Sequence, residues 1–130
     1  MALEQKKDIF SILLVDDEES VRVLFERLFS WEQFSLDIVE DGFKAIEKVK
    51  IKEYDVAFID IALPGISGYQ AFCDMKKISP NLKAVMITGY SEEFFFEASL
   101  KKGAYACLHK PFSLDILFKL IEQIKSERSI

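Results

Sequence analysis

The sequence predicts an α/β fold in which five strand–helix units, (βα)5, form a doubly wound parallel sheet. The first observation is that short aliphatic runs alternate along the chain with segments whose apolar residues recur at helical spacing. The second is that these segments are joined by short connections, without a linker, repeat or low-complexity tract. The 130 residues are 50% hydrophobic, which is enough for a single domain with a substantial core.

The strand predictions rest on the aliphatic runs. The run Ile12–Val15 contains no polar residue, which is typical of a strand buried on both faces in the middle of a parallel sheet. Helical patterns lie between this run and the other aliphatic runs. The five predicted strands are Ile9–Val15, Ser35–Val39, Asp55–Ile59, Ala84–Thr88 and Tyr105–His109.

The helix predictions rest on apolar spacing and on capping residues. One buried face of the first helix is formed by Val21, Leu24, Phe25, Leu28 and Phe29. Ser91, followed by two acids, indicates the N-cap of the fourth helix, which we expect to end by Gly103. The last helix is predicted to begin at Ser113, after Pro111, and to carry Leu114, Leu117, Phe118, Ile121 and Ile124.

The composition argues against several classes of protein. The formal net charge of −5 and the pI near 5.0 argue against general attraction to nucleic acid or anionic lipid. No apolar segment approaches the roughly 20 residues of a membrane span, and the start, "MALEQKKDIF", lacks a signal peptide's apolar stretch. We therefore expect a soluble, cytoplasmic protein that binds neither nucleic acid nor membrane directly.

Cysteine and histidine residues are too sparse for a metal site. Cys73 and Cys107 lie in apolar contexts without CxxC or Cys/His spacing, so we expect reduced residues of the core. His109, the one histidine of the sequence, has too few potential co-ligands to bind zinc.

Polar residues follow or close four of the predicted strands. Asp16 and Asp17 follow the first strand, Asp60 the third and Lys110 the fifth, and Thr88 closes the fourth. In a doubly wound sheet the ligand site lies beyond the carboxyl ends of the strands. We therefore expect these five residues to meet at one edge of the sheet.

This set of residues suits phosphoryl transfer onto a carboxylate. Clustered acids at a poorly solvated strand end raise each other's pKa unless a cation neutralises them, and Mg²⁺ prefers carboxylate oxygens. We expect Asp16, Asp17 and Asp60 to hold Mg²⁺ and Asp60 to be the nucleophile. Lys110 would supply positive charge to the phosphoryl oxygens, and the Thr88 hydroxyl would supply a hydrogen bond. The acids at 18 and 19 are interpreted as a solvated turn and helix start.

With these residues in place, the sequence resembles the receiver domains of two-component response regulators. The resemblance runs through "ILLVDDEES", "DVAFIDIALPGISG", "KAVMITGYS" and "KKGAYACLHKPFS". It covers nearly the whole chain, as one domain over residues 1–130 with a core of about 10–127. It implies a flavodoxin-like sheet in the order 2-1-3-4-5.

The resemblance also implies the roles of the strand-end residues. Asp60 would accept phosphate from a phosphohistidine on a sensor histidine kinase or a histidine phosphotransfer protein. Asp16 and Asp17 match the family's acidic pair, Thr88 its switch hydroxyl and Lys110 its lysine. A backbone carbonyl, here that of Ala62, would add a Mg²⁺ ligand, and the Lys110–Pro111 peptide would be cis. Such a domain is not an enzyme, although it assists its own phosphorylation and dephosphorylation.

The sequence departs from the family pattern three residues before the lysine. Receiver domains commonly carry Tyr or Phe there, and the movement of that aromatic ring follows the threonine. Here the residue is Cys107, and Tyr105 would lie on the same strand face two residues earlier. How this chain would switch is therefore left open.

An exposed apolar surface is expected on the fourth helix, fifth strand and fifth helix. Phe94, Phe95 and Phe96 are consecutive, so a helix cannot turn all three inward, and Ile116 and Leu120 lie beside the main stripe of the last helix. We expect this surface to contact a downstream protein or a second copy of the chain.

Three other functions share parts of this pattern. A flavodoxin-like electron carrier needs a phosphate-binding loop after the first strand, where "DDEES" would repel phosphate. A phosphatase of the haloacid dehalogenase type has a second acid two residues after its nucleophile, where this chain has Ala62. A pseudo-receiver would bind partners without phosphorylation. The sequence contains no predicted output module after the fifth helix, so the chain is either a receiver that acts alone or one excised from a longer regulator.

Overall fold

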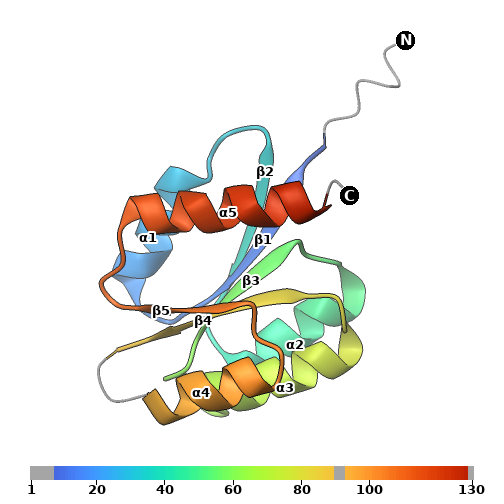
Figure 1. Cartoon of the computed structure of the whole chain (residues 1–130), viewed down its shortest axis with the longest axis vertical. Helices are drawn as coiled ribbons and strands as arrows, with labels where there is room; N and C mark the ends of the chain where they lie inside the picture. The colour runs from blue at the N-terminus through green and yellow to red at the C-terminus, as the bar shows by residue number, and fades with distance from the viewer. Residues whose placement is uncertain (1–7, 90–92, 129–130) are drawn as a thin grey trace.

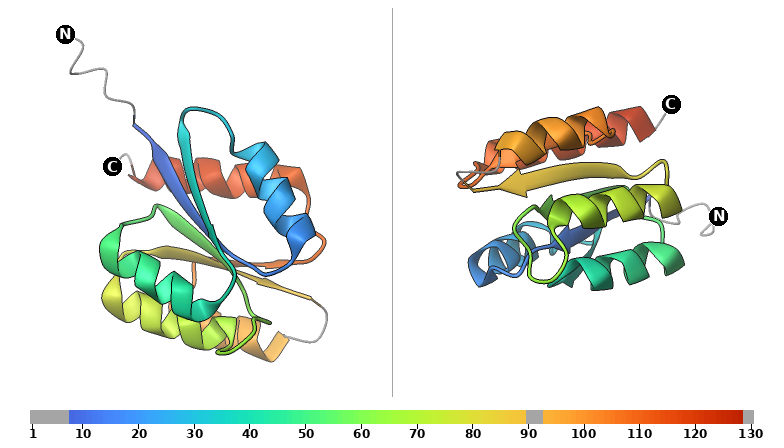
Figure 2. Two further views of the ribbon diagram at one scale, coloured as in Figure 1. Left: turned by 180° about the vertical axis from the view of Figure 1, so that it is seen from behind. Right: turned by 90° about the horizontal axis from the view of Figure 1, so that it is seen from below.

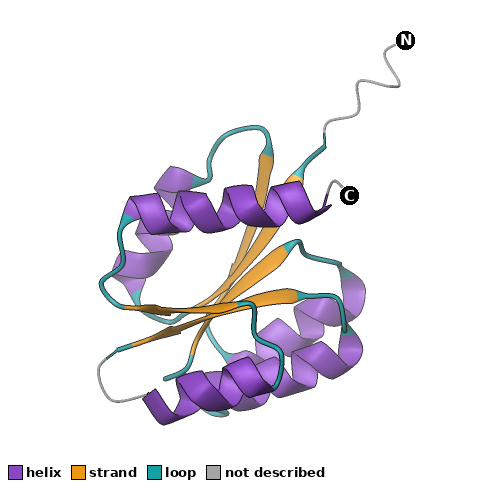
Figure 3. Cartoon of the chain, viewed as in Figure 1, coloured by secondary structure: helices purple, strands orange, loops and turns teal. Residues whose placement is uncertain are grey.

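The computed structural model describes residues 8–89 and 93–128. Within them, the chain forms one parallel sheet in the order β2-β1-β3-β4-β5, and each strand is followed by a helix (Figures 1 and 3). The predicted α/β class, the (βα)5 pattern and the strand order are therefore confirmed.

The strands begin and end within one residue of the predicted bounds. They are β1 (Phe10–Val15), β2 (Phe34–Val39), β3 (Val56–Asp60), β4 (Lys83–Thr88) and β5 (Ala106–His109). β1 and β3 occupy central positions with neighbours on both sides, and every residue of β3 is buried. This position explains why their sequences lack the polar alternation of a half-exposed strand.

Among the described residues, polar side chains cap the first turns of the second, third and fifth helices with hydrogen bonds. The helices are α1 (Glu19–Leu28), α2 (Gly42–Ile51), α3 (Gly68–Ile78), α4 (Glu93–Lys101) and α5 (Leu114–Arg128). Asp41 accepts a hydrogen bond from the Lys44 amide, and Ser67 accepts one from the Gln70 amide. The predicted start at Ser113 is confirmed, because its hydroxyl accepts from an amide of the first turn of α5. The predicted cap at residue 91 lies outside the described residues.

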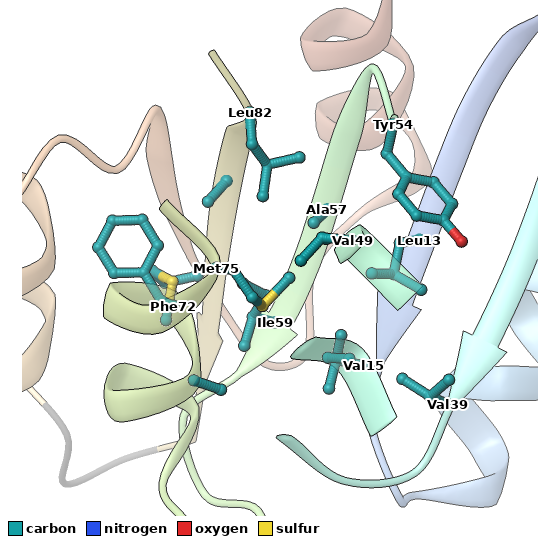
Figure 4. Packing of buried hydrophobic residues seen from close by; sticks show 14 of the residues in the cluster. Leu13, Val15, Val39, Val49, Tyr54, Ala57, Ile59, Phe72, Met75 and Leu82 are labelled. Atoms are coloured by element: carbon teal, nitrogen blue, oxygen red, sulfur yellow. The ribbon is translucent and has the colours of Figure 1, made fainter. Parts of the chain in front are cut away.

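Two apolar layers pack against the two faces of the sheet (Figures 1 and 2). α1 and α5 cover one face, where Phe25 and Leu117 lie in the same cluster as Phe58 of β3. α2, α3 and α4 cover the other face, where Phe72 and Ile59 are buried (Figure 4). Successive residues of β1 and β3 enter opposite layers, so each central strand holds both layers together.

The buried stripe of α5 does not include every apolar residue of the helix. Leu117, Ile121 and Ile124 are buried, whereas Leu114 is 45% exposed and Phe118 is 39% exposed. The Phe118 ring lies beside the stripe, 5.9 Å from the ring of Phe29 near α1. Leu114 and Phe118, which belong to the same apolar pattern in the sequence, therefore lie at the margin of the buried face. None of the described helices is long and apolar enough to cross a membrane.

Candidate functional site

The register of the sheet brings the predicted residues to one edge. Val15 pairs with Ile59, so Asp16 and Asp60 follow at the same level of β1 and β3. Asp60 pairs with Ile87, which places Thr88 at the end of the next strand. Thr88 in turn pairs with His109, and Lys110 follows directly. The convergence of all five residues is confirmed.

The three aspartates form a compact group of carboxylates. One oxygen from each of Asp16, Asp17 and Asp60 lies within 4.8 Å of the others. Asp16 and Asp60 are buried, whereas Asp17 is exposed. Each buried acid has one oxygen held by a nearby amide: Asp16 Oδ1 by Glu18 N at 2.8 Å, and Asp60 Oδ1 by Ala62 N at 2.9 Å. The local turns therefore orient both carboxylates.

The electrostatics of Asp16 favour an additional cation. Burial, together with the charge of Asp60, raises the pKa of Asp16 to about 6, although Lys110 and a backbone hydrogen bond oppose the rise. Its second oxygen, Oδ2, is buried and makes no hydrogen bond within the described part of the chain. Oδ2 lies 3.2 Å from Lys110 Nζ, a charge contact without hydrogen-bond geometry. A buried carboxylate oxygen that makes no hydrogen bond and lies beside two further acids is a suitable ligand for a hard divalent cation.

Lys110 lies among three carboxylates. Its Nζ donates to Glu18 Oε1 at 2.7 Å and to Asp60 Oδ2 at 2.9 Å, and Asp16 is the third acid nearby. Burial opposes the charged form, but these hydrogen bonds and charges raise the pKa of Lys110 above its usual range. The Lys110–Pro111 peptide is cis, as the resemblance implied, and Lys110 N donates to the Thr88 carbonyl at 2.8 Å. The lysine is thus charged and held at the sheet edge.

Glu18 is exposed at the start of α1, as predicted, but its carboxylate also belongs to this group, which was not predicted. Its carboxylate pairs with Lys110, and its pKa is lowered, chiefly by that hydrogen bond. Ser20 donates a second hydrogen bond to Glu18 Oε2 at 3.2 Å. The spacing of the acids in the sequence carried no signal for this contact, since it joins residues 92 positions apart.

Thr88 is a buried residue at the end of β4, beside Lys110. The residue is fully buried, and its Oγ1 has no hydrogen-bond partner among the residues that the structure describes. A buried hydroxyl without a partner is costly unless a ligand completes it. Thr88 therefore fits a role in binding an incoming oxygen atom.

Gly68 is a further residue that positions the site. A Cβ atom at this position would lie 1.9 Å from the carbonyl oxygen of Asp60 and 2.7 Å from Ile61 Cα. The Gly68 amide donates to the Ile61 carbonyl at 2.8 Å, so the start of α3 is packed directly on the end of β3. The glycine within "DIALPGISG" was the available signal, but its role was not predicted.

Cys107 and Tyr105 do not share a strand face, so that prediction is wrong. β5 begins at Ala106, and Tyr105 precedes the regular alternation. Tyr105 packs with the α1/α5 layer and donates to Glu127 Oε2 at 3.1 Å, whereas Cys107 packs with the α2/α3/α4 layer. Cys73 and Cys107 are both free and partly buried, and burial raises the pKa of Cys107 to about 11. Tyr105 therefore cannot substitute for an aromatic residue at 107.

Comparison with known proteins decides the family. The family model of the response regulator receiver domain matches residues 12–122. The chain belongs to this family. This receiver domain is 30% identical to sporulation initiation phosphotransferase F of Bacillus subtilis (strain 168), over 80% of this chain and 84% of that protein. It superimposes on the crystal structure of a CheY-like response regulator receiver domain protein from Methanospirillum hungatei JF-1 with a TM-score of 0.85, at 26% identity over 93% of this chain and 98% of the other.

Other relatives are much longer than this receiver domain. The DNA-binding transcriptional regulator NtrC of Escherichia coli (strain K12) is 29% identical over 86% of this chain, which spans 24% of that protein. Sensor protein EvgS of the same organism is 28% identical over 88% of this chain, which spans 10% of that protein. The similarity therefore concerns the receiver portion of these proteins. Family membership also sets aside the flavodoxin-like carrier and the dehalogenase-type phosphatase.

Proposed function

We propose that Asp60 accepts a phosphoryl group from a phosphohistidine of a sensor histidine kinase or a histidine phosphotransfer protein. The observation that carries the proposal is the position of Asp60, with Lys110 Nζ at 2.9 Å and the oxygens of Asp16 and Asp17 within 4.8 Å. A buried nucleophile, a charged lysine and an acidic group thus lie together at the carboxyl edge of the sheet. This arrangement supports phosphotransfer over a pseudo-receiver role.

The transfer requires one bond to form and one to break. An Asp60 oxygen bonds to phosphorus as the bond from phosphorus to the donor imidazole nitrogen breaks, and the nitrogen leaves with the electron pair. Lys110 would bind one phosphoryl oxygen through its charge, and the unpartnered Thr88 hydroxyl would bind another. Hydrolysis of the aspartyl phosphate by water would return the domain to its starting state.

Mg²⁺ is part of this proposal. Asp16, Asp17 and Asp60 would hold the ion, with the Ala62 carbonyl as a further ligand predicted from the family resemblance. When bound, the ion neutralises charge between the acids and the phosphoryl group. The partly unsatisfied Asp16 carboxylate supports this assignment, since it is buried beside two other acids.

The proposed partner surface lies around α4, β5 and α5, where β5 runs along the edge of the sheet between the two helices (Figure 1). Phe94 is 76% exposed and Phe96 is buried, so the prediction that the three phenylalanines cannot all point inward is confirmed. Phe95 packs 5.7 Å from the Tyr69 ring of α3, which extends the aromatic surface toward that helix. With exposed Ile116 on α5, these side chains support docking of a downstream protein or a second copy.

The extent and location of the domain complete the proposal. We assign residues 1–130 to one receiver domain with a core of about 10–127, in agreement with the family match to residues 12–122. A cytoplasmic location follows from the proposed exchange of phosphate with kinases. NtrC is described as a DNA-binding regulator, whereas this chain is proposed to act through proteins.

The test is covalent labelling with acetyl phosphate in magnesium buffer, read by mass spectrometry of the intact protein. Wild type and Asp115→Asn, which changes an exposed acid in the first turn of α5, should each gain one phosphoryl group. Asp60→Asn should gain none while its circular dichroism spectrum is unchanged. Equal labelling of Asp60→Asn and wild type would overturn the proposal.

A further inference from the structure

The shortest contact of Lys110 is with Glu18 rather than with Asp60. The Nζ distance is 2.7 Å to Glu18, 2.9 Å to Asp60 and 3.2 Å to Asp16. The Glu18 side chain is 53% exposed, whereas those of Asp60 and Asp16 are 7% and 0% exposed. The lysine is thus shared between two buried acids and one that faces solvent.

A phosphoryl group on Asp60 would compete for the same lysine. An ammonium group has three N–H donors, and here three carboxylates already surround it. Asp16 is buried and accepts a hydrogen bond from the Glu18 amide. Moving its carboxylate away from Lys110 would therefore disturb the sheet edge. Glu18 can return its carboxylate to water at small cost, because that carboxylate is already half exposed and its ion pair is therefore screened by solvent.

The surroundings of the ion pair give Glu18 room to leave. Glu18 and Lys110 line a surface cavity of about 500 Å³ together with Leu24, Gly89 and Phe112. Glu18 occupies the N-cap position of α1, but its side chain makes no capping hydrogen bond. Breaking the pair therefore neither uncaps the helix nor opens the core.

We propose that Glu18 is an exchangeable counterion of Lys110. It holds the lysine beside Asp60 before phosphorylation, and it yields this contact to a phosphoryl oxygen afterwards. Glu18 is then a positioning residue that opposes phosphoryl binding by competition. The inference deepens the proposed function and rests on it.

The test measures the affinity for beryllofluoride, a phosphoryl mimic, in magnesium buffer by fluorine NMR. Glu18→Gln should bind about two- to fivefold more tightly than wild type, the range expected from an exposed ion pair. Glu19→Gln is the matched control, because it removes the same charge one residue away and none of the described contacts joins Glu19 to Lys110. When Lys110 is also replaced by Met, Glu18→Gln should produce no increase in the affinity for beryllofluoride.

The outcomes separate this inference from the proposed function. Folded wild type that binds no beryllofluoride would overturn the proposed function and the inference with it. If wild type binds beryllofluoride but Glu18→Gln binds it no more tightly than Glu19→Gln, the inference alone is overturned. A gain that persists in the Lys110→Met background would also overturn it, since competition for the lysine could not be the cause.

Discussion

The first residue of α3, Gly68, lies so close to the carbonyl oxygen of Asp60 that a Cβ atom would approach it to 1.9 Å. Gly68→Ala should therefore move α3 away from β3 and lower the free energy of unfolding by about 3 kcal/mol. Gly89→Ala is the control, because a Cβ there would meet no atom of the described residues within 4 Å. Urea unfolding of both variants checks the prediction, and equal midpoints would contradict the close approach.

Asp60→Asn should stabilise the protein in the absence of magnesium. The change removes one of three clustered negative charges, while Lys110 keeps its contacts with Glu18 and Asp16. We expect the free energy of unfolding in EDTA to increase by about 1 kcal/mol. Added magnesium should reduce or reverse the difference, because wild type offers the better set of ligands. A lower stability of Asp60→Asn in EDTA would show that the Lys110–Asp60 pair outweighs the repulsion.

The metal-free protein should lose stability as the pH rises through the titration of Asp16. The folded pKa of about 6 lies above the ordinary value of 3.8, so the folded state binds the proton more tightly. The contribution of Asp16 to the free energy of unfolding is fully present below pH 3.8 and declines until the pH passes 6. The decline is at most about 3 kcal/mol.

Other acids oppose this slope, so the measurement compares wild type with Asp16→Asn in EDTA. Asp37 and Glu18 have lowered pKa values, and their contributions grow as the pH rises. The difference between the two proteins isolates Asp16. Parallel stability curves for wild type and Asp16→Asn would mean that burial does not raise this pKa.

The strand-end residues of the site could be predicted because parallel strands must place their carboxyl ends at the same edge. Aliphatic runs located Asp16, Asp60 and Lys110 at that edge without reference to side-chain positions. The prediction for Tyr105 failed because this residue lies before the first residue of β5, outside the regular alternation of side chains along the strand.

The contacts of Glu18 and Gly68 could not be predicted in the same way. The Glu18–Lys110 pair depends on the path of the chain after β5 and on two flexible side chains. The close approach of Gly68 depends on how deeply α3 packs against the end of β3. Neither distance is encoded in a local pattern of residues.

Phe94→Ser should weaken association through the proposed partner surface. The side chain is 76% exposed and contacts Phe95 at a ring distance of 5.4 Å, so its removal should leave the core intact. We expect self-association of the beryllofluoride-bound protein to weaken about tenfold, as for an aromatic interface residue. Ile51→Ser on α2, where the residue is 80% exposed, serves as the control. Unchanged sedimentation of Phe94→Ser would exclude this surface from self-association.

Ala62→Asn should shorten the lifetime of the phosphorylated state. Ala62 is exposed, follows Asp60 by two residues and has no polar side-chain group to orient water. An amide at this position should accelerate hydrolysis by up to about tenfold by positioning the attacking water. Ala62→Leu, similar in size but apolar, should decay no faster than wild type. The family resemblance implies that Tyr90 also flanks the path of this water, but Tyr90 lies outside the described residues. Decay of phosphorylated protein followed in magnesium buffer gives the rates, and equal rates for Asn and Leu would contradict water positioning.

Arg128, in the last turn of α5, joins the two described ends of the chain. It donates to the Ile9 carbonyl at 3.3 Å, pairs with Asp55 at 2.7 Å and lies over the Phe10 ring. These contacts lie where β1 begins, whereas the carboxylate cluster lies where β1 ends. A tether attached at either end would consequently leave from the corner remote from Asp60.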